Sequence, residues 1–236
     1  MKKFIFSAFN SEYIDKYGAS WIASLKEKSN FNGIVVLIAL GYSCSKVVDA
    51  LKLEGITVIN ADDEEDRRKV VFDIIANLQK HSDGVYAYWD IDGYFNGDVN
   101  EIFDMCNDGN VHIANNSSLG FVCGNNQAWN IYSQYRDFEN ACGLKPSMYE
   151  FITQNHSVSL VDSCWNCLAI DSASAIMSKF YHYPRIIRNT PDGMSRFDFY
   201  FDKTNQDMHD RWRHKIFGGL KPSMKRFIVN RKNKKD

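Results

Sequence analysis

The chain has no long apolar run, little net charge and only four prolines in 236 residues. A helix that crosses a bilayer needs about 20 consecutive apolar residues, so the sequence predicts no transmembrane helix. The apolar stretch Phe4–Phe9 follows two lysines but is too short for a signal peptide, and we therefore expect a cytoplasmic protein. A formal charge of −1 provides no overall field that attracts nucleic acid, so no nucleic-acid partner is expected.

The cysteines lack the spacing of a complete metal site. Cys164 and Cys167 form one Cys-x-x-Cys pair, but the sequence has no second pair to complete a tetrahedral zinc site. Cysteines spread through a cytosolic chain are mostly small buried hydrophobes. We therefore expect reduced, structural thiols at this pair rather than redox chemistry.

Charge is distributed unevenly along the chain. Residues Ala61–Asp66 are acidic, whereas residues 221–236 hold seven lysines and arginines. A basic tail of this kind can contact an anionic membrane or an acidic partner, although a solvated and frayed C-terminus explains the same composition. Peripheral membrane contact through this tail is therefore one expectation for an otherwise cytoplasmic protein.

Apolar runs and apolar helical stripes alternate through the first half of the chain. The expected strands are Phe4–Ala8, Gly33–Leu40, Ile56–Asn60 and residues 84–91. Two helices are expected at Glu12–Lys28 and Ser45–Leu53. A third is expected to be capped by Asp62 or Asp63 and has an apolar stripe from Val70 to Leu78. A fourth is expected to begin with a capping box formed by Asp98 and Glu101. This alternation predicts the α/β class, with a mostly parallel central sheet and helices on both faces. Ligands of such sheets bind beyond the carboxyl ends of the strands.

The second half of the chain is less regular. Its expected elements are a strand at Leu119–Cys123, helices at Gln127–Cys142 and Pro146–Gln154, and a hairpin formed by Arg185–Asn189 and Ser195–Phe201. No internal repeat or linker is visible. We therefore expect one domain over residues 1–236, divided into halves at 1–106 and 107–220 and the basic tail at 221–236.

An aromatic-rich run, Val85–Phe95, carries the most informative residues, Asp90 and Asp92. If the run is a strand, residues two apart share a face. Two carboxylates at the end of a buried strand carry a cost unless a cation joins them. The pattern therefore predicts a site for a divalent cation, Mn²⁺ or Mg²⁺, which could neutralise a diphosphate.

The pair stands in a longer pattern, in which Tyr88-Trp-Asp-Ile-Asp92 is followed by Gly97-Asp98 and Val99-Asn-Glu-Ile-Phe103. This order resembles glycosyltransferase family 8, which includes glycogenin and bacterial lipopolysaccharide galactosyltransferases. The resemblance implies a GT-A (Rossmann-like) fold, with residues 1–106 as the nucleotide-binding half and 107–220 as the acceptor half. It also implies transfer of a hexose from a nucleotide diphosphate sugar, expected to be a UDP-sugar, to a hydroxyl group of a glycan or glycolipid.

The same resemblance implies which residues form the site. Asp90, Asp92 and His214 would hold the cation, although the family pattern puts its histidine at the position of Lys215 and His214 is one place early. Asp162 would act as general base if the reaction inverts the anomeric configuration. The residues expected to bind the donor are Ala8, Phe9, Asn10, Tyr13, Arg67, Arg68, Ile91, Gly218 and Lys221.

Some of these residues also have a plainer interpretation. Arg67 and Arg68 could pair with the acidic residues before them, and a histidine in a charged run is commonly a surface residue.

Other functions stay open at this point. A nucleotide-sugar or glycan-binding module without turnover is favoured by the displaced His214 and by Ser118, which replaces an expected asparagine. Asp90-Ile-Asp-Gly-Tyr94 is also similar to the first motif of haloacid-dehalogenase phosphatases, but Tyr94 replaces a threonine or valine and the motif follows the fourth expected strand rather than the first. Sugar nucleotidylyltransferases have a glycine-rich loop after the first strand. They are disfavoured, because the corresponding loop here, Ala8–Tyr13, contains no glycine.

Overall fold

The structure is a computed structural model of the chain. It describes residues 1–42, 44–62, 67–115, 119–125, 129, 134, 135, 137, 138, 148–155, 158–168, 179–182 and 203–218. The predicted hairpin at 185–201, most of the predicted helix Gln127–Cys142, Lys221 and the basic tail lie outside the described residues.

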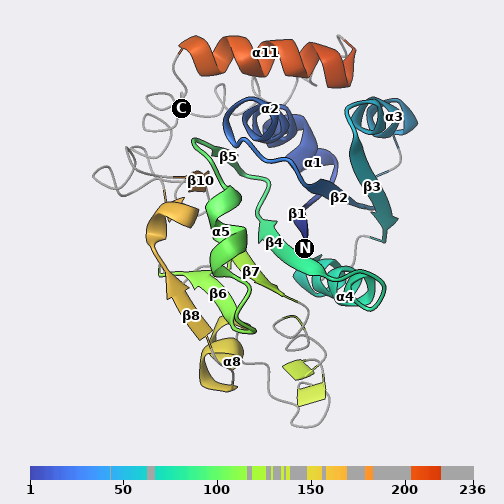
Figure 1. Cartoon of the computed structure of the whole chain (residues 1–236). Helices are drawn as coiled ribbons and strands as arrows, with labels where there is room; N and C mark the ends of the chain where they lie inside the picture. The colour runs from blue at the N-terminus through green and yellow to red at the C-terminus, as the bar shows by residue number, and fades with distance from the viewer. Residues whose placement is uncertain are drawn as a thin grey trace, which may run out of the picture.

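A seven-stranded sheet forms the centre of the molecule, in the order β3-β2-β1-β4-β7-β6-β8. Its strands are β1 (Lys2–Phe9), β2 (Ile34–Leu40), β3 (Ile56–Ala61), β4 (Gly84–Trp89), β6 (Val111–Ala114), β7 (Phe121–Asn125) and β8 (Val158–Val161). Only β7 is antiparallel to its neighbours among the described pairings. A second sheet has the order β5-β10-β9, with β5 at Gly93–Phe95, β10 at Phe180–His182 and β9 at Cys167–Leu168. The predicted α/β class with a mostly parallel sheet is confirmed, and strands from both predicted halves share the large sheet (Figure 1).

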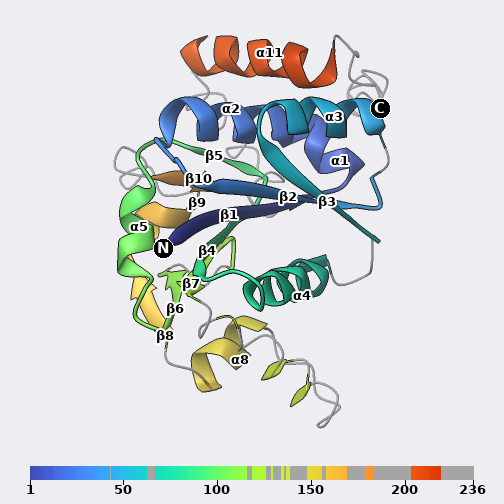
Figure 2. The same cartoon turned by 45° about the vertical axis from the view of Figure 1, so that its right-hand side comes forward.

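Helices cover both faces of the large sheet, as predicted. The described helices are α1 (Ser11–Tyr13), a π-helical turn (Ile14–Gly18), α2 (Ala19–Lys28), α3 (Ser45–Leu53), α4 (Arg67–Gln79), α5 (Asn100–Met105), α8 (Met148–Asn155), the 3-10 helix η2 (Ser163–Asn166) and α11 (Lys203–Phe217). Figure 2 shows α2 and α3 on one face and α4 on the opposite face. None of the described helices has both the length and the hydropathy that a membrane span requires.

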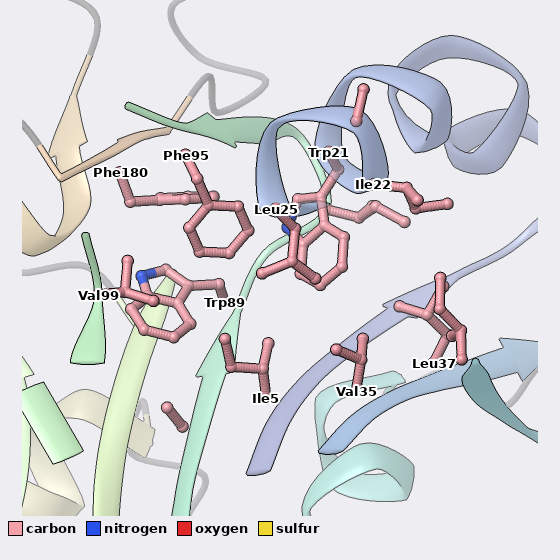
Figure 3. Packing of buried hydrophobic residues seen from close by; sticks show 14 of the residues in the cluster. Ile5, Trp21, Ile22, Leu25, Val35, Leu37, Trp89, Phe95, Val99 and Phe180 are labelled. Atoms are coloured by element: carbon pink, nitrogen blue, oxygen red, sulfur yellow. The ribbon is translucent and has the colours of Figure 1, made fainter. Parts of the chain in front are cut away.

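Strand alternation sorts the core into two layers. Ile5, Val35, Leu37 and Trp89 point toward α2, where Trp21, Ile22 and Leu25 meet them (Figure 3). The residues between them along the same strands, among them Phe6, Val36 and Tyr88, pack in a second cluster with Phe72 of α4. Because β1, β2 and β4 are covered on both faces, they are nearly continuous apolar runs, which is why they were predictable.

The helix α5 begins differently from the prediction. Its N-cap is Val99, which makes no side-chain capping hydrogen bond. Asp98 instead accepts a hydrogen bond from the main-chain N–H of Asn100 at 2.8 Å, so the predicted capping box with Glu101 is wrong. The prediction of an inward apolar face was correct, because the side chains of Val99, Ile102, Phe103 and Cys106 are all buried.

The sequence analysis missed α11, which crosses the outer side of α2 and reaches α3 (Figures 1 and 2). Its buried residues Met208, Trp212 and Ile216 stand four apart and form one stripe. Glu27 of α2 accepts hydrogen bonds from Trp212 Nε1 at 2.6 Å and from the Arg211 guanidinium at 2.9 Å. The stripe has about one apolar residue per turn, fewer than the three to four per two turns of a typical surface helix, so its signal in the sequence is weak.

A polar cluster lies at the start of β6, the end of the sheet opposite to the carboxyl ends of its parallel strands. His112 Nε2 is 2.8 Å from Asp108 Oδ1. Burial alone would lower the pKa of His112, but the neighbouring Cys106 and Asp108 side chains outweigh it and raise the pKa above its ordinary value. Burial would likewise raise the pKa of Cys106, but Cys123 and His112 together lower it to about 7.

We expect Asp108→Asn to destabilise the protein more at pH 5.5 than at pH 8.5. A pKa raised by folding contributes stability below the unfolded value of about 6.5, and this contribution is lost as pH rises through the folded-state pKa. The extra loss at pH 5.5 should be about 1 kcal/mol or less, because Asp108 is partly exposed. Urea unfolding at both pH values measures it.

Asp104→Asn is the control, because Asp104 is also an exposed carboxylate but pairs with Lys3, at 3.5 Å, rather than with a histidine. Equal losses for Asp108→Asn at both pH values would show that the charge on His112 does not stabilise the fold.

We also expect Ile216→Ala to lower the free energy of unfolding by about 2–5 kcal/mol, since Ile216 is one of the buried residues of α11. His214→Ala on the same helix should change it by no more than about 0.5 kcal/mol, because His214 is exposed. Chemical denaturation of both variants tests the packing of α11, and a negligible loss for Ile216→Ala would contradict it.

Candidate functional site

The candidate site lies where β1 and β4 end side by side. The two strands are parallel, with Phe6 opposite Tyr88. The chain leaves β1 toward helices on one face of the sheet and reaches β4 through α4 on the other face (Figure 2). This is a topological switch point, the place where open α/β sheets bind ligands. The predicted loop after β1 and the predicted acidic pair after β4 both lie there.

Asp90 lies just beyond β4. The sequence analysis extended the strand to residue 91, but the strand ends at Trp89. The main-chain N–H of Asp90 donates to the Gly120 carbonyl at 2.9 Å, beside the β4–β7 pairing. The Asp90 carboxylate is half-buried and accepts a hydrogen bond from the Tyr88 hydroxyl at 2.5 Å.

Asp92 lies in the turn between β4 and β5. Its direction is therefore not set by strand alternation, which the sequence analysis had assumed. The turn is held by long-range contacts, because Gly93 pairs with His182 of β10 and the Phe95 N–H donates to Ser24 Oγ at 2.9 Å. Asp92 is buried, with only 6% of its surface exposed. The Ile91 side chain is buried in the core, so a donor contact at this position would use its main chain.

The predicted nucleoside loop follows β1 and opens α1. Asn10 is the N-cap of α1, and its Oδ1 accepts the Tyr13 N–H at 3.1 Å. The Tyr13 ring is half-buried beside Tyr17, with 5.8 Å between the ring centroids. Ala8 is partly exposed, whereas Phe9 is buried. Tyr13 and the Asn10 main chain are therefore the groups of this loop best suited to contact a ligand.

Arg67 and Arg68 are the first two residues of α4, and the structure describes their main chain but not their side chains. Because β3 runs parallel to β1 and β4, its end at Ala61 and the start of α4 lie at the same edge of the sheet as Asp90. The N-terminus of a helix favours anions. The two arginines are thus near enough to this edge to remain candidates for phosphate contact.

Asp162 follows β8 at the same edge of the sheet. The adjacent strand β6 ends there too, where the Asn115 N–H donates to the Val161 carbonyl at 3.0 Å. Three strand spacings of about 4.8 Å separate β4 from β8, so the ends of these strands are about 14 Å apart. Asp162 is exposed and accepts the Cys164 N–H at 2.7 Å as the N-cap of η2. It shares the edge with Asp90 but is too far away to bind the same cation.

The structure does not bring His214 to the acidic pair. His214 is exposed on α11, which lies outside α2. The helix α11 continues through His214 to Phe217. Gly218 ends the helix with φ 57°, and its N–H donates to the His214 carbonyl at 2.8 Å, a left-handed cap that favours glycine. Lys221 lies outside the described residues.

The Cys-x-x-Cys pair shows no sign of an activated thiol. Cys164 is half-buried and Cys167 is buried. Burial first, and then the neighbouring Asp162, raises the pKa of Cys164 to about 12. A thiol with this pKa stays protonated at neutral pH and is a poor nucleophile or metal ligand. The structure therefore agrees with the structural role that we expected.

Asp90 and Asp92 fit a hard divalent cation as partial ligands. In the described part of the chain, no group of three His, Cys, Asp or Glu side chains comes together as cation ligands. Mg²⁺ at phosphate substrates commonly takes one or two carboxylates from the protein and completes its shell with phosphate oxygens and waters. Carboxylate oxygens also suit Mn²⁺, so the donor set fits either ion together with a diphosphate.

The sequence analysis did not assign a role to Tyr88, although the signal for one was present. A tyrosine two residues before an aspartate at a strand end lies on the same face and can reach it. The sequence analysis also gave no role to Gly120, whose carbonyl accepts the Asp90 main-chain N–H. That contact joins residues far apart in sequence and could not be predicted from spacing.

No protein-family model and no curated protein matches the sequence, but solved structures are similar to it. The glycosyltransferase GlyE of Streptococcus pneumoniae TIGR4 has a TM-score of 0.61 at 14% identity, over 91% of this chain and 64% of GlyE. The apo structure of the bifunctional glycosyltransferase WbbM has a TM-score of 0.58 at 11% identity, over 84% of this chain and 51% of WbbM.

Mouse xyloside xylosyltransferase 1 in its apo form has a TM-score of 0.52 at 13% identity, over 77% of this chain and 97% of the mouse protein. This chain thus spans less than two thirds of the GlyE and WbbM chains that it matches. Membership of glycosyltransferase family 8 stays a prediction. At these identities the similarity concerns the fold, and the chain has the GT-A-like fold of these glycosyltransferases.

Proposed function

We propose that this chain is a metal-dependent glycosyltransferase that moves a hexose from a UDP-sugar to a hydroxyl group of a glycan or glycolipid. The observation that supports the proposal most directly is the position of Asp90 and Asp92 beyond β4, beside the end of β1, in a fold shared with solved glycosyltransferases. The proposal includes membership of family 8, a cytoplasmic location and membrane contact through residues 221–236.

In this proposal each segment at the edge has one task. Asp90 and Asp92 hold Mn²⁺ or Mg²⁺, which when bound would neutralise the diphosphate and stabilise it as a leaving group. The loop from Asn10 to Tyr13 holds the nucleoside. Arg67 and Arg68 donate to the phosphate oxygens from the start of α4, with Lys221 as a further phosphate contact. His214 has no task here, because α11 carries it away from the pair.

A module that binds a nucleotide sugar without turnover is the second candidate. It is favoured by one observation, that no group of three potential cation ligands comes together among the described residues. Tight binding of UDP with neither hydrolysis nor transfer across a panel of acceptors would support it. The phosphatase alternative is weaker, because the acidic pair follows β4 rather than β1, and hydrolysis of p-nitrophenyl phosphate with Mg²⁺ would distinguish it.

We expect Asp92→Asn to weaken Mn²⁺ binding in the presence of UDP by about 100-fold or more, because it removes a direct ligand and even supporting groups are worth 10–100-fold. Turnover of a UDP-sugar should fall with it. Titration calorimetry and a transfer assay measure the two effects.

Asp83→Asn is the matched control, since Asp83 is exposed at the opposite end of β4, and it should leave both quantities unchanged. Full metal-dependent activity in the Asp92 variant would reject the assignment of the pair.

Asp162→Asn should lower kcat by about 100-fold or more if Asp162 acts as general base. Its melting temperature should change little, because asparagine caps a helical turn as well as aspartate does. Comparing kcat with the melting temperature separates catalysis from capping. Unchanged kcat would remove Asp162 from the mechanism and favour retention of configuration, without affecting the assignment of the acidic pair.

A further inference from the structure

Tyr88 makes a side-chain hydrogen bond to one of the proposed cation ligands, Asp90. It lies on β4, two residues before Asp90, on the face of the sheet that α4 covers. Its hydroxyl donates to Asp90 Oδ1 at 2.5 Å. A hydrogen bond to an ionised carboxylate is roughly twice as strong as one between two neutral groups.

The ring of Tyr88 is fixed by its surroundings, so the hydroxyl has a defined position. Only 4% of the residue is exposed. Phe72 of α4 packs edge-on against the ring, with 5.3 Å between the centroids. Packing in the core leaves the Tyr88 side chain little freedom to move. The hydrogen bond therefore restricts the Asp90 carboxylate more than it restricts the tyrosine.

Asp90 is thus held at both its main chain and its side chain. The N–H donates to the Gly120 carbonyl, and Oδ1 accepts from Tyr88. Fixing one oxygen of a planar carboxylate also fixes the direction of the other. Hydrogen bonds of this kind, from groups that do not themselves touch the metal, orient ligands and commonly contribute 10–100-fold to metal affinity.

We infer that Tyr88 is a positioning residue for the cation site, acting through its hydrogen bond to Asp90. The inference rests on the proposed function, since it assigns to Asp90 the role of a metal ligand. It predicts that the hydroxyl group, and not the aromatic ring, determines how tightly the cation binds.

Tyr88→Phe tests this directly, because it removes the hydroxyl and keeps the ring. Mn²⁺ affinity in the presence of UDP is measured by electron paramagnetic resonance, and the melting temperature is measured without metal. We expect the Kd for Mn²⁺ to rise by about 10–100-fold. We also expect kcat at saturating Mn²⁺ to change less than the Mn²⁺ concentration required for half-maximal rate.

Tyr86→Phe is the matched control. Tyr86 lies on the same strand and face, is equally buried, and its hydroxyl donates to the Ser82 carbonyl at the far end of β4. Both variants lose one buried hydroxyl, so a general effect on folding would appear in both. Only Tyr88→Phe should weaken Mn²⁺ binding.

The outcomes separate this inference from the proposed function. If the wild-type protein binds Mn²⁺ and Tyr88→Phe binds it equally well, Tyr88 is structural and the inference is overturned while the proposed function stands. If both variants weaken binding equally, the effect is one of folding and the inference fails in the same way. If the wild-type protein binds no Mn²⁺ with UDP, the proposed cation site is rejected, and the role of Tyr88 is rejected with it.

Discussion

The parallel pairing of β1 with β4 is the constraint on which the rest of the structure depends. It joins the first strand to the fourth and brings the ends of both to one edge of the sheet. The loop from Asn10 to Tyr13 and the turn from Asp90 to Asp92 become neighbours only through this pairing. The helices beside these strands lie on opposite faces of the sheet (Figure 2), which makes this edge a topological switch point. The fold therefore brings these two segments together, and the residues that follow the strands determine the chemistry of the edge.

Strand alternation then gives consecutive residues of β4 different tasks. Trp89 points to the α2 side, where its Nε1 donates to the Trp165 carbonyl at 2.9 Å and its ring packs 4.9 Å from that of Phe121. These contacts anchor the end of the strand to the second half of the chain. Tyr88 points to the α4 side and reaches Asp90. Packing on one face thus fixes the backbone that presents the carboxylate, while the other face supplies the group that orients it.

The sequence predicted the parts of the fold that local pattern determines. Continuous apolar runs located β1, β2 and β4 within one or two residues, because strands buried on both faces leave a plain signal. The short strands β6 and β8 were missed, since four residues carry little periodicity. For the site, the position of Asp90 and Asp92 at a strand end was correct in outline. The turn that holds them was not predictable, because its partners Ser24, Gly120 and His182 are distant in sequence. The position of His214 away from the pair was not predictable either, because it depends on the packing of α11 against α2 and α3, which are also distant in sequence.

The burial of Asp92 connects stability with the proposed activity. A carboxylate removed from water costs several kcal/mol unless hydrogen bonds or an opposite charge compensate, and Asp92 is 6% exposed while Asp90, two residues away, is also acidic. The two like charges repel most strongly where the surroundings exclude water. In the proposed function a divalent cation would compensate both charges when it binds. Under that proposal cation binding and folding stability are coupled, because a ligand that binds only the native state also stabilises it.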